Sequence, residues 1–334
     1  MDITFNRINS PDWAFLDRLP DRTIFQTKPW LEFVSEAQKA EICVLEVRVD
    51  AQLLGYFTGL IIRKAGFRIL GSPFPGWSTD YLGFNLMLDT DRTTLLAPLA
   101  RFAFRELGCW HVELMDRRLT VDMVRSLGWR HRLFDNSEID LSLSEDRIFA
   151  NFKGSCRTSI RKAEKCGVTV EASTDPEFAD DYYTQLVDVF AKQNLRPTYS
   201  VERVRLLIKH LMPTGHLLLV RARNAEGLCV ATGIFPAFNR TMHFWGGASL
   251  RQHQILQPNE AILWFAMRYW KAHGISVCDM GGGGTYKAKY GGGPFVLPWC
   301  RISRNEWVAN AREIAQQSYA WLRHTIGRGM HILK

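Results

Sequence analysis

The chain has 334 residues, of which 46% are hydrophobic and 23% are charged. This is the composition of an ordinary globular protein, and it excludes a disordered chain, a collagen and a small disulfide scaffold. A domain of roughly 150 residues is typical, so the length predicts two domains. Lysine and arginine total 42 against 34 acidic residues, giving a net charge of +8. That charge suits an anionic ligand such as CoA, a nucleotide, a phosphorylated lipid or tRNA, and equally an inert basic surface.

The cysteines, the first residues and the apolar runs of the sequence bear on the compartment in which the protein works. Seven cysteines are scattered without a CxxC pair, which argues against a disulfide framework and a cysteine-clustered zinc site. Residues 1–10 lack the pattern of a signal peptide, and no run of 18 apolar residues occurs, so we expect a cytoplasmic protein. Near the C-terminus, Arg323, Arg328 and Lys334 stand among apolar residues. This tail suits either a frayed helix or a peripheral contact with a membrane surface.

The first half of the chain has strand patterns followed by a helical pattern and a further strand. Leu95, Leu96 and Leu99 have the spacing of one helix face, and Gly108 ends that helix. We expect strands at residues 42–49, 52–62, 67–70 and 111–115, helices at 91–107 and 121–127, and extended chain at 129–143.

The second half repeats this outline. Each half contains an antiparallel meander, a helix, a glycine (Gly108 or Gly274) and a strand that ends on an acid (Glu113 or Asp279). The shared outline predicts two α+β units of similar architecture. We expect one or two helices at residues 146–166, further helices at 176–193, 200–211 and 258–273, and strands at 168–171, 216–223, 228–238, 241–247 and 275–279. The predicted domains are an N-terminal domain at 1–148, a C-terminal domain at 149–303 and a C-terminal helix at 304–334.

A basic helix opens the second domain. Lys153, Arg157, Arg161 and Lys165 follow one another at i+4 steps, with Lys162 beside Arg161, so a helix carries them along one face. Only one acidic residue occurs among residues 151–166. This face is either a clamp for phosphate or pyrophosphate or a solvated helix face.

A glycine-rich segment follows the last predicted strand of this domain. Seven of the residues 281–293 are glycine, and backbone without side chains can approach a ligand closely. Lys287 and Lys289 supply positive charge, and Tyr286 and Tyr290 supply aromatic faces or hydroxyls. The segment is neither a Walker loop nor a GxGxxG fingerprint. We interpret it as a ligand-binding loop, with a flexible surface loop as the alternative.

The meander between these two motifs carries the third candidate. Gly233 lies inside a predicted central strand beside Ala231, which indicates a bulge or a close backbone approach, where free N–H groups could hold an acyl donor. Pro258 begins the following helix, with Asn259 as its expected cap, and a helix N-terminus can bind an anion. The sequence lacks HExxH and GxSxG, which argues against a zinc or serine hydrolase.

The order of these motifs resembles the Fem-type aminoacyl and acyl transferases and the related CelD-like acetyltransferases of the GNAT superfamily. The resemblance covers roughly residues 20–300. The matching pieces are Phe25 to Trp30, Gly71 to Pro73, Thr79 to Tyr81, Arg157 to Gly167, Ala231 to Gly233, Pro258-Asn259 and Asp279 to Gly291.

This resemblance implies an α+β fold of two tandem GNAT-like domains, each a mostly antiparallel mixed sheet flanked by helices. It implies an N- or O-acyltransferase that moves an acyl or aminoacyl group to an amine or hydroxyl of a cell-envelope, polysaccharide or lipid-linked acceptor by direct attack. Acyl-CoA is the expected donor, aminoacyl-tRNA the alternative donor, and no metal is expected. The rival interpretation is a catalytically inactive GNAT-like module that binds a nucleotide or polyanion. We expect no DNA partner, and the sequence leaves the oligomeric state open.

The resemblance and the motifs together assign candidate site residues. Asp279 and Asp80 are candidates for the general base, and Asp279 has the alternative of capping the glycine turn. Lys287 is expected to stabilise the developing oxyanion. The basic helix and Lys287 are expected to face a single cleft. The expected donor-binding residues are Ala231, Gly233, Asn259, Tyr286, Lys287 and Lys289, and the expected acceptor-binding residues are Lys153, Arg157, Arg161, Lys162 and Tyr290.

Overall fold

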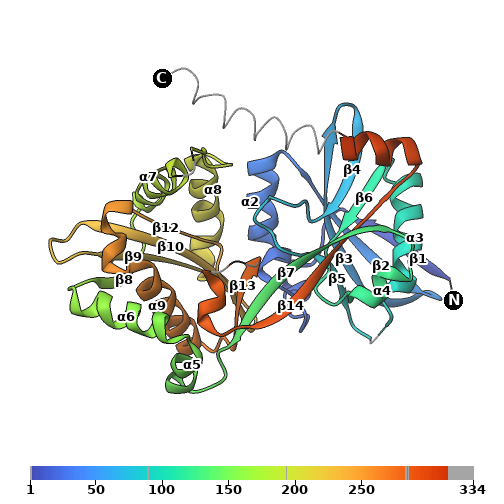
Figure 1. Cartoon of the computed structure of the whole chain (residues 1–334). Helices are drawn as coiled ribbons and strands as arrows, with labels where there is room; N and C mark the ends of the chain where they lie inside the picture. Colours follow the sequence, from blue (N-terminus) through green and yellow to red (C-terminus); the bar gives the residue numbers. More distant parts are fainter. Residues whose placement is uncertain (1, 89, 193, 283, 285, 315–334) are drawn as a thin grey trace. The chain divides into compact units, whose positions relative to one another are not determined.

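The computed structural model describes residues 2–314 except 89, 193, 283 and 285 (Figure 1). The chain forms two compact units: the first comprises the residues up to Phe134 and from Val296 on, and the second is Asp135–Phe295. These bounds differ from the domain bounds of 148 and 303 expected from the sequence. The reason is that the strands β7 (Arg130–Asp140) and β14 (Gly293–Ser303) each contribute residues to both units.

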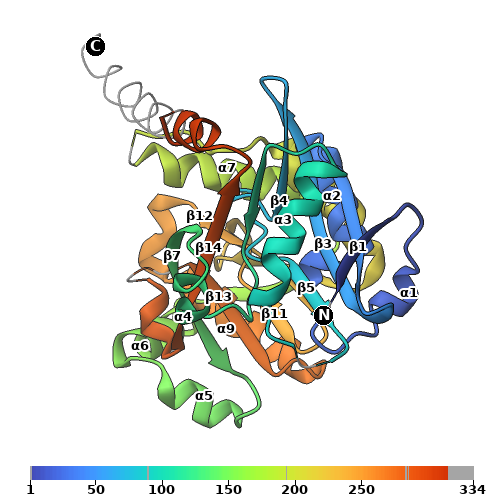
Figure 2. The same cartoon turned by 90° about the vertical axis from the view of Figure 1, so that its right-hand side faces the viewer.

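The first unit is built on one mixed sheet with the strand order β1-β2-β3-β4-β6-β14, and β5 pairs with β3. Pairing is antiparallel except between β4 and β6, which run parallel. Helices α2 and α3 lie on opposite faces of this sheet, and Figure 2 shows α3 crossing the near face. The elements are β1 (Ile3–Ile8), α1 (Trp13–Leu16), η1 (Ile24–Gln26), α2 (Lys28–Gln38), β2 (Glu41–Val49), β3 (Gln52–Lys64), β4 (Phe67–Ser72), β5 (Gly83–Leu86), α3 (Thr93–Arg105), β6 (His111–Leu114) and α4 (Val121–Arg125).

The core of the first unit lies between α3 and the sheet. The predicted spacing is confirmed, because Leu95, Leu96 and Leu99 of α3 are fully buried in one cluster with Phe57 and Val112 of the strands. Burying a leucine side chain contributes about 2 kcal/mol, so this stripe fixes the helix to the sheet.

The second unit is built on a mixed sheet with the order β7-β13-β11-β10-β9-β8, and β12 pairs with β10. Among the described strand pairs of this unit, only β11 and β13 run parallel. Figure 1 shows α7 and α8 on one face of the strands β8 to β10, and α6 and α9 on the other. The elements are α5 (Glu145–Asn151), α6 (Gly154–Lys165), β8 (Thr169–Ser173), α7 (Phe178–Ala191), α8 (Val201–Leu211), η2 (Met212–Thr214), β9 (Leu217–Arg223), β10 (Cys229–Phe238), β11 (Thr241–His243), β12 (Gly246–Ser249), η3 (Arg251–Leu256), α9 (Pro258–Ala272), β13 (Val277–Gly282) and η4 (Lys287–Tyr290).

The expected fold class is confirmed, since both sheets are mixed, mostly antiparallel and flanked by helices. The expectation missed β1, α1, α2 and β5, and it differs from the structure at two further places. The strand expected at 241–247 is divided into β11 and β12, because Phe244 N–H donates to Asp279 O at 2.9 Å and Trp245 N–H then bonds Ile234 O at 3.2 Å. The strand β14 was not expected, because Pro294 and Pro298 interrupt its hydrophobic pattern.

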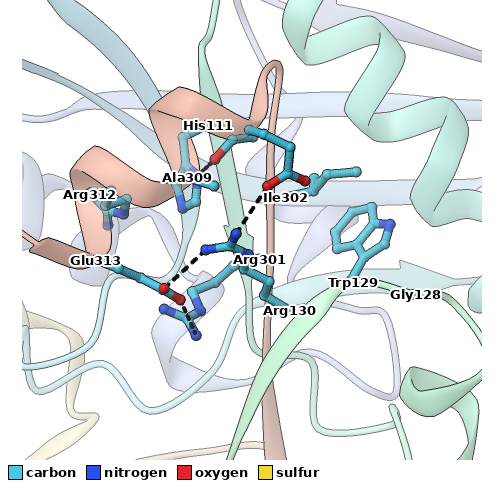
Figure 3. Close-up of a pocket in the computed structure, with 11 residues that line it drawn as sticks. His111, Gly128, Trp129, Arg130, Arg301, Ile302, Ala309, Arg312 and Glu313 are labelled. Atoms are coloured by element: carbon cyan, nitrogen blue, oxygen red, sulfur yellow. Dashed lines mark hydrogen bonds and ion pairs between the residues drawn. The ribbon is translucent and has the colours of Figure 1, made fainter.

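A polar layer joins β6 and β14 to the helical residues 306–314 within the first unit (Figure 3). The ring of His111 is 2.7 Å (Nδ1) from Ser303 Oγ, and the fully buried Glu113 accepts a hydrogen bond from Arg312. The first contact joins β6 to β14, and the second attaches the helix to the sheet. The remainder of the C-terminal helix expected at 304–334 lies outside the described residues.

Candidate active site

The sheet of the second unit opens where β11 ends. β11 pairs with β13 as far as His243 and Asp279. Beyond that point β12 stays with β10, while β13 continues beside β7 through the pair of Gly282 and Asn136. Among the described strands, β12 pairs with β10, and no other strand pairs along its second edge. Backbone N–H and C=O groups on such an edge can pair with an extended ligand.

A pocket of about 280 Å³ lies at this opening, wholly within the second unit. Its lining combines an apolar wall with a few hydrogen-bonding side chains, as is typical of small-molecule sites. The lining residues are Val189, Thr232, Phe244, Gly247, Ala248, Ser249, Gln254, Asn259, Ile262 and Tyr286.

The N-terminus of α9 lies at this pocket. Its N-cap is Gln257, with a left-handed φ of 60°, so the expectation that Asn259 caps the helix is wrong. Because Pro258 takes the first helical position, Asn259 is one residue further on, where its Nδ2 donates to Ser249 Oγ at 2.9 Å. The positive end of the α9 dipole favours an anionic group here.

The central strand β10 forms the floor of the pocket. The expected irregularity occurs as a register shift between Cys229 and Ala231. Thr232 lines the pocket, and its Oγ1 donates to Gln185 Oε1 at 2.7 Å. At Gly233 a Cβ atom would lie 2.5 Å from the Phe235 ring of the same strand and 2.7 Å from Ile262 of α9, so both side chains approach this glycine closely.

The glycine-rich segment is fixed to the first turn of α9 by a cluster of four side chains. Lys289 forms an ion pair with Glu260, whose side chain is only 8% exposed, and Lys289 Nζ lies 4.1 Å from the centre of the Tyr286 ring. The hydroxyls of Tyr286 and Tyr290 are 3.0 Å apart, and Tyr290 is fully buried. Our sequence analysis did not assign a role to Glu260, although it follows Asn259 directly.

Burial raises the pKa of both tyrosine hydroxyls well above the ordinary value, and the charge of Glu260 adds to the effect at Tyr286. Both hydroxyls therefore stay protonated at neutral pH, and one of them donates its hydrogen bond to the other. Tyr286 lines the pocket with about a third of its surface exposed (36%). It can accordingly donate to a ligand or leaving group, and it cannot serve as a base at neutral pH.

Lys287 and Asp279 make contacts with the backbone. Lys287 Nζ donates to Met280 O and lies 5.6 Å from the ring centre of Phe244, which lines the pocket. The buried Asp279 accepts a hydrogen bond from Gly281 N–H at 2.7 Å, and its other oxygen is 3.8 Å from His243 Nδ1. The contact to Gly281 is the capping role that the sequence offered as the alternative to a general base.

Asp80, the second candidate base, belongs to the first unit, where it is half-buried in the loop between β4 and β5. Of the expected site residues, only Asn259 and Tyr286 line the pocket. Ala231 and Gly233 flank the lining residue Thr232.

The basic helix α6 has the predicted amphipathic pattern. It buries Cys156, Ile160 and Ala163 and exposes the opposite face. Arg157 donates to Ala150 O at 2.9 Å and to Phe152 O, so its guanidinium holds the C-terminal end of α5. Neither Arg157 nor Lys287 lines the pocket described here. The exposed cations are Lys153, Arg161, Lys162 and Lys165.

Among the described residues, no group of three or more His, Cys, Asp and Glu side chains could hold a metal ion. None of the helices in this part of the chain is long and apolar enough to cross a membrane.

Comparison with known proteins identifies the second unit. Residues 150–290 match the family model of the acetyltransferase (GNAT) domain. No curated protein sequence is significantly similar to the chain.

Solved structures show the same fold at low sequence identity. FemX aligns with a TM-score of 0.69 and 13% identity over 89% of this chain and 97% of FemX. A tandem GNAT protein from the clavulanic acid biosynthesis pathway aligns with a TM-score of 0.53 and 12% identity over 91% of this chain and 99% of that one. The C-terminal domain of a putative lysylphosphatidylglycerol synthetase from Agrobacterium fabrum aligns with a TM-score of 0.54 and 12% identity over 86% of this chain and 96% of that one.

The expected resemblance is confirmed in both the domain family and the fold. The match of residues 150–290 supports acyl transfer as the class of activity. Residues 150–290 thus form an acetyltransferase (GNAT) domain, in a chain that has the fold of FemX and of tandem GNAT proteins.

Proposed function

We propose that this protein is an N- or O-acyltransferase that uses acyl-CoA as donor, with aminoacyl-tRNA as the alternative donor. The observation that carries the proposal is the pocket in the GNAT domain, bounded by the open edge of β12, the N-terminus of α9 and Tyr286. The acceptor is an amine or hydroxyl of a cell-envelope, polysaccharide or lipid-linked compound.

The geometry of the pocket suits the parts of an acyl-CoA. The amide-bearing arm of CoA is an extended chain, and such a chain pairs with an open strand edge as another strand would. The α9 N-terminus beside Asn259 favours the pyrophosphate. The apolar wall around Phe244 and Ile262 accommodates the acyl group.

The reaction is a direct displacement. The acceptor nitrogen or oxygen attacks the donor carbonyl carbon, the carbonyl oxygen becomes an oxyanion, and the bond to the CoA sulfur breaks. The acceptor proton passes to a base, and the departing thiolate takes up a proton. Backbone N–H groups of the open edge and the cation of Lys287 stabilise the oxyanion, each good donor contributing about 3 kcal/mol. Asp279 remains the candidate base within this unit, and Tyr286 is the proton donor that lines the pocket.

The exposed face of α6 is our candidate for recognition of an acceptor phosphate. Lys153, Arg161 and Lys162 are exposed there, and the only acid within residues 151–166 is Glu164. An acceptor activated by a phosphate or pyrophosphate, as lipid-linked and nucleotide-linked sugars are, would be attracted to this face.

A screen of donors tests this function. The purified protein is incubated with acetyl-CoA, longer acyl-CoA compounds or aminoacyl-tRNA, its melting temperature is measured, and products on candidate acceptors are identified by mass spectrometry. We expect one donor class to raise the melting temperature and to yield acylated acceptor. Stabilisation by generic polyanions alone, with no acylated product, would support the inactive binding module instead.

A further inference from the structure

An aromatic cluster lies on the surface of the first unit and includes no residue assigned to acyl transfer. The ring centres of Phe67 and Trp110 are 5.4 Å apart, and Trp307 lies 5.9 Å from each of them. Trp307 is 54% exposed. Phe67 follows the β3–β4 turn and Trp307 belongs to the helical residues 306–314, which both views show at one end of this unit (Figures 1 and 2).

The helix of residues 306–314 presents a second apolar face outward. Val308 and Ala309 are buried against the unit, whereas Trp307 and Ile314 are 54% and 64% exposed. A spacing of seven residues brings Trp307 and Ile314 to the same side of a helix.

Cations surround this cluster. Arg304 N–H donates to Trp110 O at 2.9 Å, and its guanidinium lies 5.4 Å from the Trp110 ring centre. Arg63 and Lys64 are exposed at the β3–β4 turn. Among the described residues, no carboxylate forms an ion pair with Arg63, Lys64 or Arg304. The neighbouring Glu306 is engaged with Arg130 at 3.0 Å.

We propose that this surface, composed of Phe67, Trp110, Trp307 and Ile314 with the rim Arg63, Lys64 and Arg304, binds the surface of a membrane that contains anionic phospholipids. Tryptophan rings favour the boundary between headgroups and hydrocarbon, because the indole has an apolar body and a polar N–H. Each lysine or arginine near an anionic lipid surface contributes attraction. The exposed Trp307 indole and cations without an ion pair among the described residues together fit a lipid headgroup layer, which supplies both chemistries.

The inference is independent of the proposed acyl transfer, since none of these residues belongs to the GNAT-domain pocket. Bound in this way, the protein would lie on the membrane and meet lipid-linked acceptors in two dimensions.

Vesicle sedimentation of the full chain tests the proposal. We expect binding to vesicles of phosphatidylcholine with phosphatidylglycerol, weaker binding to phosphatidylcholine alone, and loss of binding at high salt. The double variant Arg63→Ser/Lys64→Ser should reduce the partition coefficient roughly 25-fold, at about fivefold per cation. The double variant Trp307→Ser/Ile314→Ser should reduce binding to both vesicle types. Ile255→Ser, which changes a 68% exposed residue of the other unit, is the matched control and should bind as the unchanged protein does.

Two results would overturn the proposal. One is binding that is equal on neutral and anionic vesicles and is unaffected by Arg63→Ser/Lys64→Ser, two exposed side chains whose replacement leaves the packing intact. The other is a protein that stays in the supernatant with both vesicles but forms dimers that Trp307→Ser/Ile314→Ser dissociates, which would make the surface an interface between copies. Donor binding by the GNAT domain should be unchanged in all these variants. A failure of the proposed acyl transfer would therefore be seen separately from a failure of membrane binding.

Discussion

Single side chains connect the glycine-rich segment to the rest of the GNAT domain. Lys289 is paired with the nearly buried Glu260 of α9, and Lys287 holds the backbone at Met280. These contacts explain how a segment with so many glycines can present Tyr286 to the pocket in a defined position. Each lysine therefore has a structural contact as well as a proposed role in the reaction, and kinetic experiments must distinguish the two.

The ion pair of Lys289 and Glu260 should respond asymmetrically to substitution. Lys289→Met leaves the Glu260 carboxylate without its partner, which should lower the free energy of unfolding by about 3 kcal/mol. The double variant Lys289→Met/Glu260→Gln should recover much of that loss, because the buried charge is gone. Urea unfolding of both proteins measures the difference. Equal stability of the single variant and the unchanged protein would show that the pair contributes nothing.

Gly233 should tolerate no side chain. A Cβ atom there would lie 2.5 Å from the Phe235 ring and 2.7 Å from Ile262, so Gly233→Ala should lower stability by about 2 kcal/mol through overpacking. Gly282→Ala is the matched control, because a Cβ at Gly282 meets no atom within 4 Å. Thermal unfolding compares the two variants. A melting temperature for Gly233→Ala as high as that of the control would refute the packing of α9 on β10.

Lys287 and Arg157 should affect different kinetic constants once the substrates are known. Lys287→Ala should reduce kcat/KM about 100-fold if the cation stabilises the oxyanion, and Lys287→Arg should retain part of the activity. Arg157→Ala should raise the acceptor KM with little change in kcat, if Arg157 holds acceptor phosphate. Lys192→Ala, an exposed lysine outside the proposed site, serves as the control. Unchanged turnover in a folded Lys287→Ala protein would remove Lys287 from the mechanism.

Among the elements, β6, β14 and the helix of residues 306–314 share a buried polar layer whose charge state depends on pH. Burial, reinforced by the charges of Arg312 and Arg301, lowers the pKa of His111 to about 3. Burial raises the pKa of Glu113 to about 7, although the same two arginines oppose this shift. The two groups therefore act in opposite directions between pH 4.5 and 6.5. The unfolded chain takes up a proton at His111 there, whereas it releases one at Glu113.

His111→Gln isolates one of these contributions. As pH falls below 6.5, unfolded protein binds a proton at His111 and folded protein does not, so the histidine destabilises the fold by about 2 kcal/mol at pH 5. His111→Gln does not undergo this loss of stability. The effect of Glu113 is the same in both proteins, because His111 is uncharged in the folded state. Urea unfolding at pH 7.5 and pH 5 should show the variant gaining stability relative to the unchanged protein. A difference that is the same at both pH values would contradict a buried neutral histidine.

In the molecule as a whole, local sequence patterns predicted helices and strands better than they predicted which residues form the candidate site. The leucine spacing of α3 and the glycines that end helices predicted elements that the structure confirms, because both signals act over a few residues. The strand β14 escaped prediction because its two prolines obscure a pairing with β6 that is distant in sequence. The partnership of Lys289 with Glu260 spans 29 positions, and spacing alone could not reveal it. The pocket likewise depends on where β12 and β13 part, which is a property of the sheet.

The segment that precedes α9 determines how a donor pyrophosphate could be bound. The segment before α9 is a 3-10 helix, Arg251–Leu256, without glycine, followed by Gln257 in a left-handed conformation. A donor pyrophosphate would therefore depend on the α9 N-terminus and its neighbouring side chains. The proposed function therefore depends above all on whether this pocket binds an acyl-CoA donor.

Hydrogen exchange measured by mass spectrometry, with and without acyl-CoA, tests the central claim most directly. If the pocket of the GNAT domain binds the donor, acyl-CoA should slow exchange in residues 246–249, on the open strand edge, and in residues 258–262, at the start of α9. Free adenine nucleotide should protect the second segment without the first, because it lacks the extended arm. Unchanged exchange in both segments with every acyl-CoA and with aminoacyl-tRNA would contradict a donor site in this pocket.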